Sequence, residues 1–352
     1  MKIVNFTASA VLVALTFYIL VIGQALLLPL VVAVAIWFLI NLLAAGFGQV
    51  PVGSRRLPRW LCLVAAIFSF IALGWGVINF IGDSIADVSR VIPAYQVNLE
   101  NRLRDMPFSA YFFDSETGEF SGFLLEAGWL DLPGLFTSLV GSFTTVITSS
   151  GLILIYIVFL FLEQGAIDRK ITNLVGNSER EKKVRKIISK INSDINKYIS
   201  IKMFTSTLTG VLSYILLVAV GVDFAIIWGL LIFLLNFIPT IGSIIATIFP
   251  AVISLAQFEG YTQFFIVLGG VGVFQNLIGN FLEPKMMGNT FNLSPLLILL
   301  NLGLWGYVWG VIGMFLCVPL LIIIFIVLSH FPQTRPIAIM LSSNGNVGHY
   351  QD

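Results

Sequence analysis

Long apolar runs dominate this chain and limit what it can fold into. The runs Phe6 to Leu28, Trp60 to Ile81 and Val308 to Leu328 are long enough, as helices, to cross a hydrocarbon core about 30 Å thick. Only 11% of the 352 residues are charged, whereas about a quarter are charged in an ordinary soluble domain. The sequence therefore predicts an all-α fold, a polytopic transmembrane helical bundle, and not a soluble enzyme.

Motifs that bind nucleotides, metals or nucleic acids are missing from the sequence. No GxxxxGKS/T phosphate loop occurs, and no glycine is followed by lysine. Cys62 and Cys317 lie inside apolar runs with no Cys/His motif around them, so we expect two buried small hydrophobic residues. A net charge of +1 does not suggest binding to nucleic acid. We therefore expect no cofactor, metal or nucleic-acid partner, and any transport would be passive or gradient-coupled unless a separate subunit supplies ATP.

The distribution of lysine and arginine predicts the orientation of the spans. Residues 163–202 hold ten basic side chains against five acidic ones, whereas residues 83–140 hold three against nine. Basic connections stay in the cytoplasm, so 163–202 and the arginine-rich loop 55–59 are expected inside, with 83–140 outside and both termini cytoplasmic. Pro29 is expected to begin the second span. The first four spans are predicted at 6–28, 30–47, 59–82 and 139–162.

Two amphipathic helices are predicted outside the spans. In residues 85–103 apolar side chains recur every three or four positions, and this outer helix is expected to lie along the membrane surface. Residues 106–133 show no period and are predicted to be irregular loop. The inner helix, 179–199, opposes isoleucine and valine with lysine and arginine. It is either a gate or coupling helix, or a helix docked on its own bundle or on a neighbouring subunit.

Two hydrophobic segments in the C-terminal half are interrupted. In 228–255 the break falls at Pro239 and Gly242, and each arm of about 15 residues reaches only about 22 Å as a helix. Segment 296–320 repeats this arrangement, with LLILLN giving way to several glycines. We predict two broken or re-entrant hairpins that enter from opposite sides as an inverted pair. A conventional eight-span topology is the alternative, because hydropathy sets topology only approximately.

These features divide the chain into five regions. Broken helices near the bilayer midplane mark substrate sites in secondary transporters, so the fourth region is the expected transport region. The regions are the first three transmembrane helices (1–82), a periplasmic amphipathic helix and loop (83–138), the fourth transmembrane helix with the cytoplasmic basic helix (139–202), the transport region with two interrupted hairpins (203–330) and the C-terminal tail (331–352).

A line of polar side chains ends the span that follows the first hairpin. Asn276, Asn280 and Glu283 are spaced four and three apart and are expected to share one helix face, with Gln275 beside them. Carboxamides both donate and accept hydrogen bonds, which suits a small polyhydroxylated solute. A carboxylate within a span costs about 2.5 to 3.5 kcal/mol. Glu283 is therefore either functional, or paired at the cytoplasmic interface with Lys285 or another base.

The helix breaks supply further candidates. Asn236 and Asn301 precede the two breaks, where their side chains either satisfy freed backbone groups or bind a ligand. Glu163 and Lys202 are expected to be interfacial anchors. The predicted substrate-binding residues are Asn236, Pro239, Gly242, Gln275, Asn276, Asn280, Glu283 and Asn301. The predicted gating or coupling residues are Glu283, Lys285, Gly306 and Gly310.

Four stretches of the chain resemble signatures of the autoinducer-2 exporter family. The resemblance is strongest over residues 150–342 and weakens in the outer loop, so no substrate preference that the loop carries is transferred. The stretches are YISIKMFTSTLTG (198–210), WGLLIFLLNFIPTIGS (228–243), NFLEPKMMG (280–288) and LSPLLILLNLGLWGYVWGVIGMFLCVPL (293–320).

The resemblance implies a homo-oligomeric, pentameric secondary transporter in the bacterial inner membrane. Some members are assigned the quorum-sensing signal autoinducer-2 as substrate, and others are assigned sodium or lithium/proton antiport. The expected function is export of a small polar metabolite, autoinducer-2, by alternating access. The alternatives are a Na+(Li+)/H+ antiporter and an oligomeric channel. The expected partners are the solute, H+ or Na+ as coupling ion, the lipid bilayer and further copies of the chain.

Overall fold

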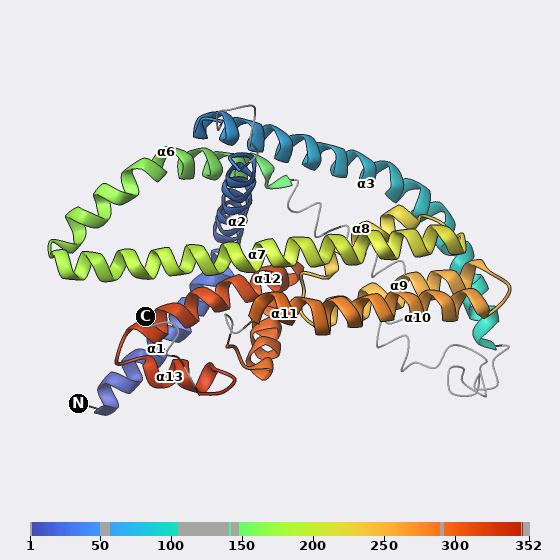
Figure 1. Ribbon diagram of the computed structural model, residues 1–352. Helices are drawn as coiled ribbons and strands as arrows, with labels where there is room; N and C mark the ends of the chain where they lie inside the picture. Colours follow the sequence, from blue (N-terminus) through green and yellow to red (C-terminus); the bar gives the residue numbers. More distant parts are fainter. Residues whose placement is uncertain are drawn as a thin grey trace. The chain divides into compact units, whose positions relative to one another are not determined.

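The computed structural model describes residues 2–49, 57–104, 141, 148–288, 292–345 and 347 (Figure 1). The predicted irregular loop 106–133 lies outside these residues. The named elements are all helices: α1 (Lys2–Ile22), α2 (Gln24–Phe47), α3 (Arg59–Arg104), α6 (Ser150–Val175), α7 (Ser178–Val220), α8 (Ala225–Leu235), α9 (Ile241–Gln257), α10 (Thr262–Asn276), the π-helix η2 (Leu277–Leu282), α11 (Glu283–Met287), α12 (Pro295–His330) and α13 (Arg335–Leu341).

Six of the described helices are long and apolar enough to cross a membrane, which confirms the predicted all-α, polytopic character. Shorter apolar helices occur at Val11–Ile22, Ala225–Leu235 and Ile241–Gln257. The six are Gln24–Phe47, Arg59–Val77, Ser150–Ile167, Ser178–Val220, Thr262–Met287 and Pro295–His330.

The chain divides into two compact units. Unit 1 comprises Met1–Phe70, Ser142–Tyr198 and Asn289–Asp352, and unit 2 comprises Ile71–Gly141 and Ile199–Gly288. Helices α3 and α7 each begin in unit 1 and continue into unit 2. The interrupted segment around Pro239 therefore belongs to unit 2, and the one around Gly310 belongs to unit 1.

In unit 1, α2 packs against α6 and the start of α3. The ring of Trp37 lies 6.5 Å from that of Phe161, and small side chains between the helices let the backbones approach. Cys62 and Cys317 are both buried, which confirms the interpretation of both as buried small residues. The buried cluster consists of Ile40, Ala44, Cys62 and Ala66.

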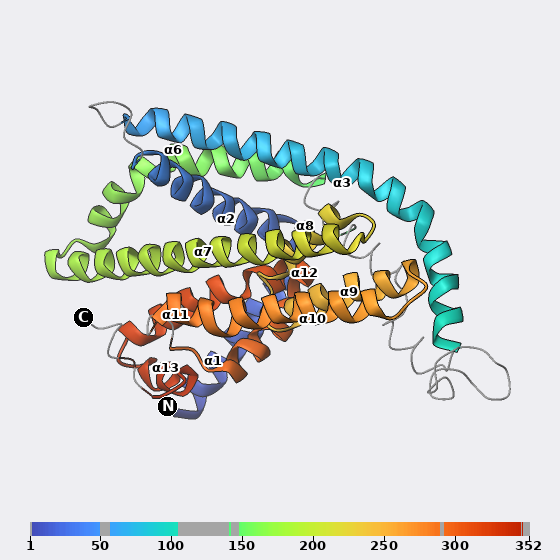
Figure 2. The same ribbon diagram turned by 45° about the vertical axis from the view of Figure 1, so that its right-hand side comes forward.

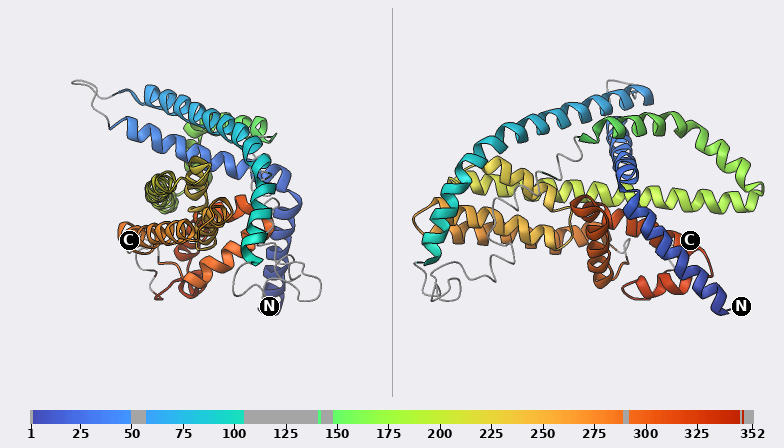
Figure 3. Two further views of the ribbon diagram at one scale, coloured as in Figure 1. Left: turned by 90° about the vertical axis from the view of Figure 1, so that its right-hand side faces the viewer. Right: turned by 180° about the vertical axis from the view of Figure 1, so that it is seen from behind.

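Helices α1 and α2 are joined by one residue, Gly23. Its N–H bonds the carbonyl of Ile19 at 2.7 Å, and a Cβ at Gly23 would lie only 2.7 Å from that oxygen. Antiparallel helices need a connection of two to five residues, and α2 leads away from α1 in every view (Figures 1 and 3). The two helices therefore meet at Gly23, and the boundary predicted between spans 6–28 and 30–47 is wrong. Pro29 lies inside α2, not at its beginning.

Helix α12 reverses its direction at Trp309 and Gly310, whose φ angles of −132° and +62° are not helical. The side-chain amide of Asn301 donates to the carbonyl oxygen of Cys317 at 2.7 Å. In a straight helix these two residues would be about 24 Å apart, because each residue rises 1.5 Å. The two arms of α12 therefore lie side by side.

Close backbone packing holds this reversal. Gly313 approaches the carbonyl oxygen of Trp305 so closely that a Cβ on Gly313 would overlap it. At the turn, the indole N–H of Trp309 donates to the carbonyl oxygen of Leu20 at 3.2 Å. Leu20 belongs to the last turn of α1, where helix termini leave carbonyl groups without intrahelical partners. The end of α1 is thus tied to the turn of α12.

In unit 2, α8 and α9 are joined by residues 236–240 and pack against each other (Figure 2). Thr240 in this turn has a φ of +58°, which is uncommon for residues other than glycine. A Cβ on Gly242 would overlap the carbonyl oxygen of Leu235, so only glycine fits there. The arms hold 11 and 17 residues, about 16 and 26 Å as helices, and neither matches a 30 Å core.

The C-terminal part of α3, which belongs to unit 2, packs on the other helices of that unit. Helix α3 is unbroken, so the predicted third span and the predicted outer helix form one helix. The Tyr95 hydroxyl donates to Asp223 Oδ2 at 2.5 Å, and the Asn98 amide donates to the Ala256 carbonyl at 3.2 Å. Figure 3 shows this teal part of α3 crossing the ends of α8, α9 and α10. At Tyr95, which is 7% exposed, protein covers the apolar stripe that the sequence placed along the membrane surface.

The glycine packing in α12 predicts a position-specific cost of adding a methyl group. Gly313→Ala should lower the melting temperature of the detergent-purified protein, since overpacking costs about 1–3 kcal/mol. Gly303→Ala is the matched control, because a Cβ there meets nothing within 4 Å and alanine favours the helix. Equal melting temperatures for the two variants would contradict the packed reversal.

Candidate functional site

The part of α7 in unit 2 carries a row of polar side chains on one side. The row faces protein, whereas Phe204, Val211 and Ile215 on other sides of the helix are 48% to 55% exposed. Helical residues three or four positions apart share a face, so these polar residues form a continuous stripe. A transmembrane helix at the edge of a bundle is expected to turn its polar face toward the other helices and its apolar face toward lipid. The row is Lys202, Thr205, Ser206, Thr209 and Ser213, all between 0% and 7% exposed.

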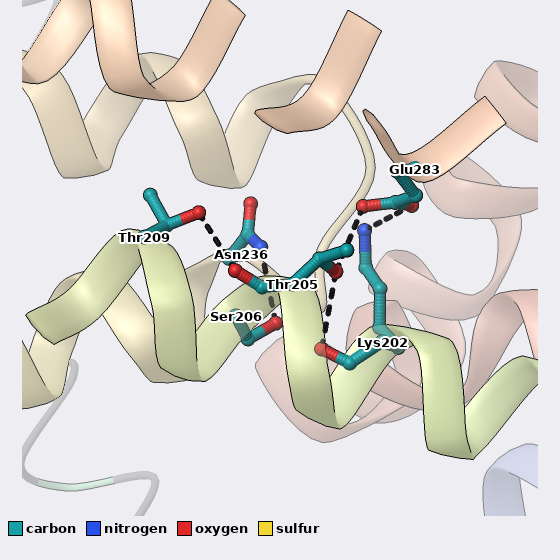
Figure 4. A network of polar contacts seen from close by, with 6 residues as sticks. All are labelled: Lys202, Thr205, Ser206, Thr209, Asn236 and Glu283. Carbon is teal, nitrogen blue, oxygen red and sulfur yellow. Dashed lines mark hydrogen bonds and ion pairs between the residues drawn. The ribbon is translucent and has the colours of Figure 1, made fainter. Parts of the chain in front are cut away.

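An ion pair lies at one end of this row (Figure 4). Lys202 Nζ is 2.7 Å from Glu283 Oε1, and their side chains are 9% and 13% exposed. The Thr205 hydroxyl donates to the second carboxylate oxygen, Oε2, at 3.2 Å. Each carboxylate oxygen thus has a donor, which offsets the cost of removing the charges from water. Glu283 is paired with a base, as one of the two interpretations expected, but that base is Lys202 and not Lys285.

Asn236 extends the polar network across to α8 (Figure 4). Its side-chain amide donates to Ser206 Oγ at 3.0 Å, and Asn236 is 6% exposed. Asn236 ends α8, yet its side chain forms this bond between helices instead of satisfying the backbone of the turn. Within α7, the hydroxyl of Thr209 donates to the carbonyl of Thr205 at 2.8 Å. The first helix break is therefore joined to the polar row by a hydrogen bond.

The π-helix η2 changes the predicted arrangement of the polar residues before α11. Asn276 and Asn280 share an exposed face, where the Asn280 amide donates to the Asn276 side-chain oxygen at 3.4 Å. Gln275 and Glu283 instead turn inward. The single face predicted for Asn276, Asn280 and Glu283 is therefore wrong, because the prediction assumed α-helical spacing through residues 277–282. Lys285 is exposed on α11.

Gln275 is one of three residues in the described part of unit 2 whose buried side chains have unmet hydrogen-bonding capacity. It is 9% exposed, and its side-chain Nε2 is buried without a hydrogen-bond partner. The hydroxyl of Ser213 is likewise buried without a partner. The third such group in unit 2 is Gln263 Oε1. Buried polar groups are usually hydrogen-bonded, so three such groups in one unit call for an explanation.

The remaining predicted residues are found at the two helix breaks. In unit 1, Asn301 donates to Cys317 and accepts from the Trp305 indole at 3.1 Å, so its side chain satisfies groups of α12 itself. Gly310 takes the positive φ of the turn, and Gly306 lies against the end of the Met314 side chain. In unit 2, Pro239 lies in the turn between α8 and α9, and Gly242 lies in the first turn of α9. Asn301 thus fits the backbone-satisfying alternative.

The N-terminal half of α7 packs against its own chain. Asp194 and Tyr198 are 3% and 4% exposed, which favours the docked alternative for the basic helix 179–199. Lys190 Nζ lies 3.3 Å from Asp194 Oδ1. Glu163 accepts a hydrogen bond from Lys170 at the surface, with 60% of its side chain exposed.

Across the described part of the chain, no three His, Cys, Asp or Glu side chains lie close enough together to hold a metal ion.

Sequence reasoning missed most of the polar row. It treated Lys202 as an anchor at the membrane surface and did not single out Thr205, Ser206, Thr209 or Ser213. The signal was present, because these residues recur at helical spacing inside an otherwise apolar run. Their partners on α8, α10 and α11 are distant in sequence, so the spacing alone could not identify them.

Six candidate spans, paired charges and a polar helix face turned away from lipid define a multi-pass membrane protein. The model of the AI-2E family transporters matches residues 8–333, and the chain belongs to this family. It is therefore a member of a transporter family and not an enzyme.

Curated relatives of similar length extend the likeness across most of the chain. A "Putative transport protein" of Haemophilus influenzae is 29% identical over 296 residues, which cover 82% of this chain and 83% of that protein. The "AI-2 transport protein TqsA" of Escherichia coli is 28% identical over 290 residues, or 82% of each chain. The "Putative transport protein YhhT" of Escherichia coli is 39% identical over 119 residues, which are 34% of each chain.

The burial of the ion pair predicts that its loss costs more than the loss of an exposed pair. Lys202→Met should destabilise the purified protein by about 3–5 kcal/mol, because Glu283 is left charged and unpaired. The control Lys170→Met breaks a pair of the same 2.7 Å length, but both side chains are more than half exposed, so about 0–1 kcal/mol is expected. Chemical denaturation in detergent measures both values. Similar losses in the two variants would show that Lys202 and Glu283 are not buried together.

Proposed function

We propose that this chain is a bacterial inner-membrane secondary transporter that exports a small polar metabolite, autoinducer-2, by alternating access. The observation that carries this proposal is the buried row of hydroxyl groups along α7 in unit 2, joined by the side-chain amide of Asn236 at the end of α8. Such groups both donate and accept, which suits a neutral polyhydroxylated solute. The name of TqsA as an AI-2 transport protein supports the choice of solute. By family resemblance, the transporter is a homo-oligomer, a pentamer.

The proposed topology keeps both termini in the cytoplasm. The basic residues before Lys202 favour a cytoplasmic location for that end of α7. Ser206, which bonds Asn236 at the end of α8, lies close to the same end. The turn between α8 and α9 would then point toward the cytoplasm, and this hairpin would enter from the periplasm. Because α12 follows the cytoplasmic Lys285 closely in sequence, its reversal would form the inverted, second re-entrant hairpin.

The proposed solute site in unit 2 lies at the break after α8 and at the polar segment before α11, with Asn236, Gln275 and Glu283. Asn301, at the break in unit 1, is a separate candidate for solute binding. Asn276 and Asn280 are exposed in the single chain and would meet solute only in one state of the cycle. Gly306 and Gly310 would allow the second hairpin to move, because glycine permits close approach and unusual backbone angles.

Cation/proton antiport is the second candidate function, and Glu283 favours it. An antiporter needs a carboxylate that exchanges a proton during the cycle, and the Glu283 side chain is only 13% exposed, beside one compensating lysine. An oligomeric channel is the third candidate, since a pentamer can enclose a central pore. Flux through a channel would not depend on a proton or sodium gradient.

Transport by purified protein in proteoliposomes tests these candidates. Labelled autoinducer-2 should move faster than in empty liposomes, and imposed proton or sodium gradients should change its rate. Glu283→Gln should alter the rate and flatten its pH dependence, whereas Glu163→Gln, in an exposed pair, should leave both unchanged. Sodium-driven proton flux without autoinducer-2 flux would establish the antiporter. Unchanged kinetics in Glu283→Gln would reduce this residue to a structural role.

The inverted-hairpin proposal predicts labelling of its two turns from opposite sides. After replacement of Cys62 and Cys317 by alanine, Thr240→Cys should react with a membrane-impermeant thiol reagent from the cytoplasm and Gly306→Cys from the periplasm. The movable end of Met314 leaves room for a side chain at Gly306. Autoinducer-2 should change both labelling rates, since a ligand shifts a two-state equilibrium through different affinities. Labelling of both positions from one side would favour the conventional eight-span topology.

A further inference from the structure

Among the described residues, the hydroxyl of Ser213 on α7 and the side-chain amide nitrogen of Gln275 on α10 are two of the three buried polar groups of unit 2 without a hydrogen-bond partner; the third is Gln263 Oε1. Ser213 is 0% exposed and Gln275 is 9% exposed. A buried group without a partner is costly, and most such groups in native proteins bind water, an ion or a ligand. The positions of these two groups on their helices show whether one guest could serve both.

Contacts of α7 show which side of the helix Ser213 occupies. Ser206 bonds Asn236 of α8, and a Cβ on Gly210 would lie 2.9 Å from the Gly229 carbonyl, also of α8. Leu216 meets Gly270 of α10, and Lys202 meets Glu283 just beyond it. Helix α7 therefore has one side against α8 and an adjacent side against α10–α11.

Ser213 points between these two sides. At 100° per residue, and relative to Lys202, Leu216 lies at about −40° and Ser206 at about +40° around the axis of α7. On the same scale Ser213 lies at about +20° and Thr209 at about −20°. Both hydroxyls therefore face the seam between α8 and α10, which is the interior of the four helices α7 to α10.

Gln275 points into the same interior from α10. Gly270 lies against the side chain of Leu216, so it faces α7. A Cβ on Gly272 would lie 3.9 Å from Thr247 Cγ2, so Gly272 faces α9. Relative to Val271, these glycines lie at about −100° and +100° around the axis, and Gln275 lies between them at about +40°. Val271 itself is completely buried, as expected of this inner side.

The two unpartnered groups also lie at nearly the same level. Helices α7 and α10 run antiparallel, because Leu216 meets Gly270 whereas Lys202 meets Glu283. Leu216 and Gly270 are at the same level. Gln275, five residues after Gly270, is therefore level with position 211, five residues before Leu216. Ser213 is two residues from that level, about 3 Å along the axis. One small polar group placed between them can reach both.

The chemistry of the two groups defines the guest. The Gln275 amide nitrogen can only donate, so the guest must accept a hydrogen bond there, and the Ser213 hydroxyl can donate or accept. A hydroxyl group meets both requirements. The guest must be neutral, because the charges of Lys202 and Glu283 already compensate each other and a third buried charge would be unpaired.

We propose that Ser213 and Gln275, with Thr209 beside them, form the contact in unit 2 that binds a hydroxyl group of a neutral transported solute. This inference rests on the proposed function and adds α7 residues that determine its specificity. The Lys202–Glu283 pair then closes the cytoplasmic end of a polar path along α7. Ser254 on α9 offers a matched control, since it is also 0% exposed but its hydroxyl donates to its own helix at Ala251, 2.7 Å away.

Transport kinetics of single variants in proteoliposomes test the proposal with autoinducer-2 as the probe. Ser213→Ala and Gln275→Met should each raise KM about 3- to 10-fold with a smaller change in kcat, as expected for one lost hydrogen bond to solute. Ser254→Ala should leave KM unchanged. If Ser213→Ala leaves KM unchanged and raises the melting temperature, the hydroxyl was merely unsatisfied or bound to water, and the proposal is wrong.

Thiol labelling tests the site independently of autoinducer-2 transport. If the wild-type protein moves no autoinducer-2, that result overturns the proposed solute alone. In a chain with Cys62 and Cys317 replaced by alanine, Ser213→Cys should react with the small neutral reagent methyl methanethiosulfonate, because a polar site supports the thiolate. Ser254→Cys should stay unreactive. Equal lack of reaction at both positions would show that the interior around Ser213 is dry and would overturn the site itself.

Discussion

Two opposite charges meet inside unit 2, where neither could remain alone. Lys202 and Glu283 are 81 residues apart in sequence, and their 2.7 Å contact holds α7 against the segment that follows α10. An unpaired charge in such a setting costs several kcal/mol, so the pairing limits how these helices can pack. With this end fixed, Leu216 meets Gly270 and the hydroxyl row of α7 faces inward.

The same constraint on unpaired polar groups shapes both chain reversals. Inside a membrane, a helix break is tolerated only where protein or water satisfies the freed backbone groups. In the α8–α9 turn and in the α12 turn, a glycine on the returning arm lies against a carbonyl of the preceding arm, Gly242 on Leu235 and Gly313 on Trp305. Asn301 adds a side-chain bond across α12. Two breaks with different sequences thus use the same close packing of a glycine against a carbonyl.

Local features of the structure could be predicted from sequence, and non-local ones could not. Hydropathy predicted the apolar helices, and glycine and proline predicted the breaks near Gly242 and Gly310, because each effect acts within a few residues. The partner of Glu283 depends on packing between distant helices, so the choice between Lys285 and another base stayed open. The π-helix at 277–282 and the junction at Gly23 change helix geometry without an obvious sequence signal.

Exchange of the two charges tests most directly whether the ion pair organises unit 2. The single variants Lys202→Glu and Glu283→Lys each place two like charges together and should abolish the cooperative thermal transition of the purified protein. The double variant restores opposite charges, so its transition should return to within a few degrees of the wild-type temperature. A double variant no more stable than the worse single variant would contradict the pairing of Lys202 with Glu283.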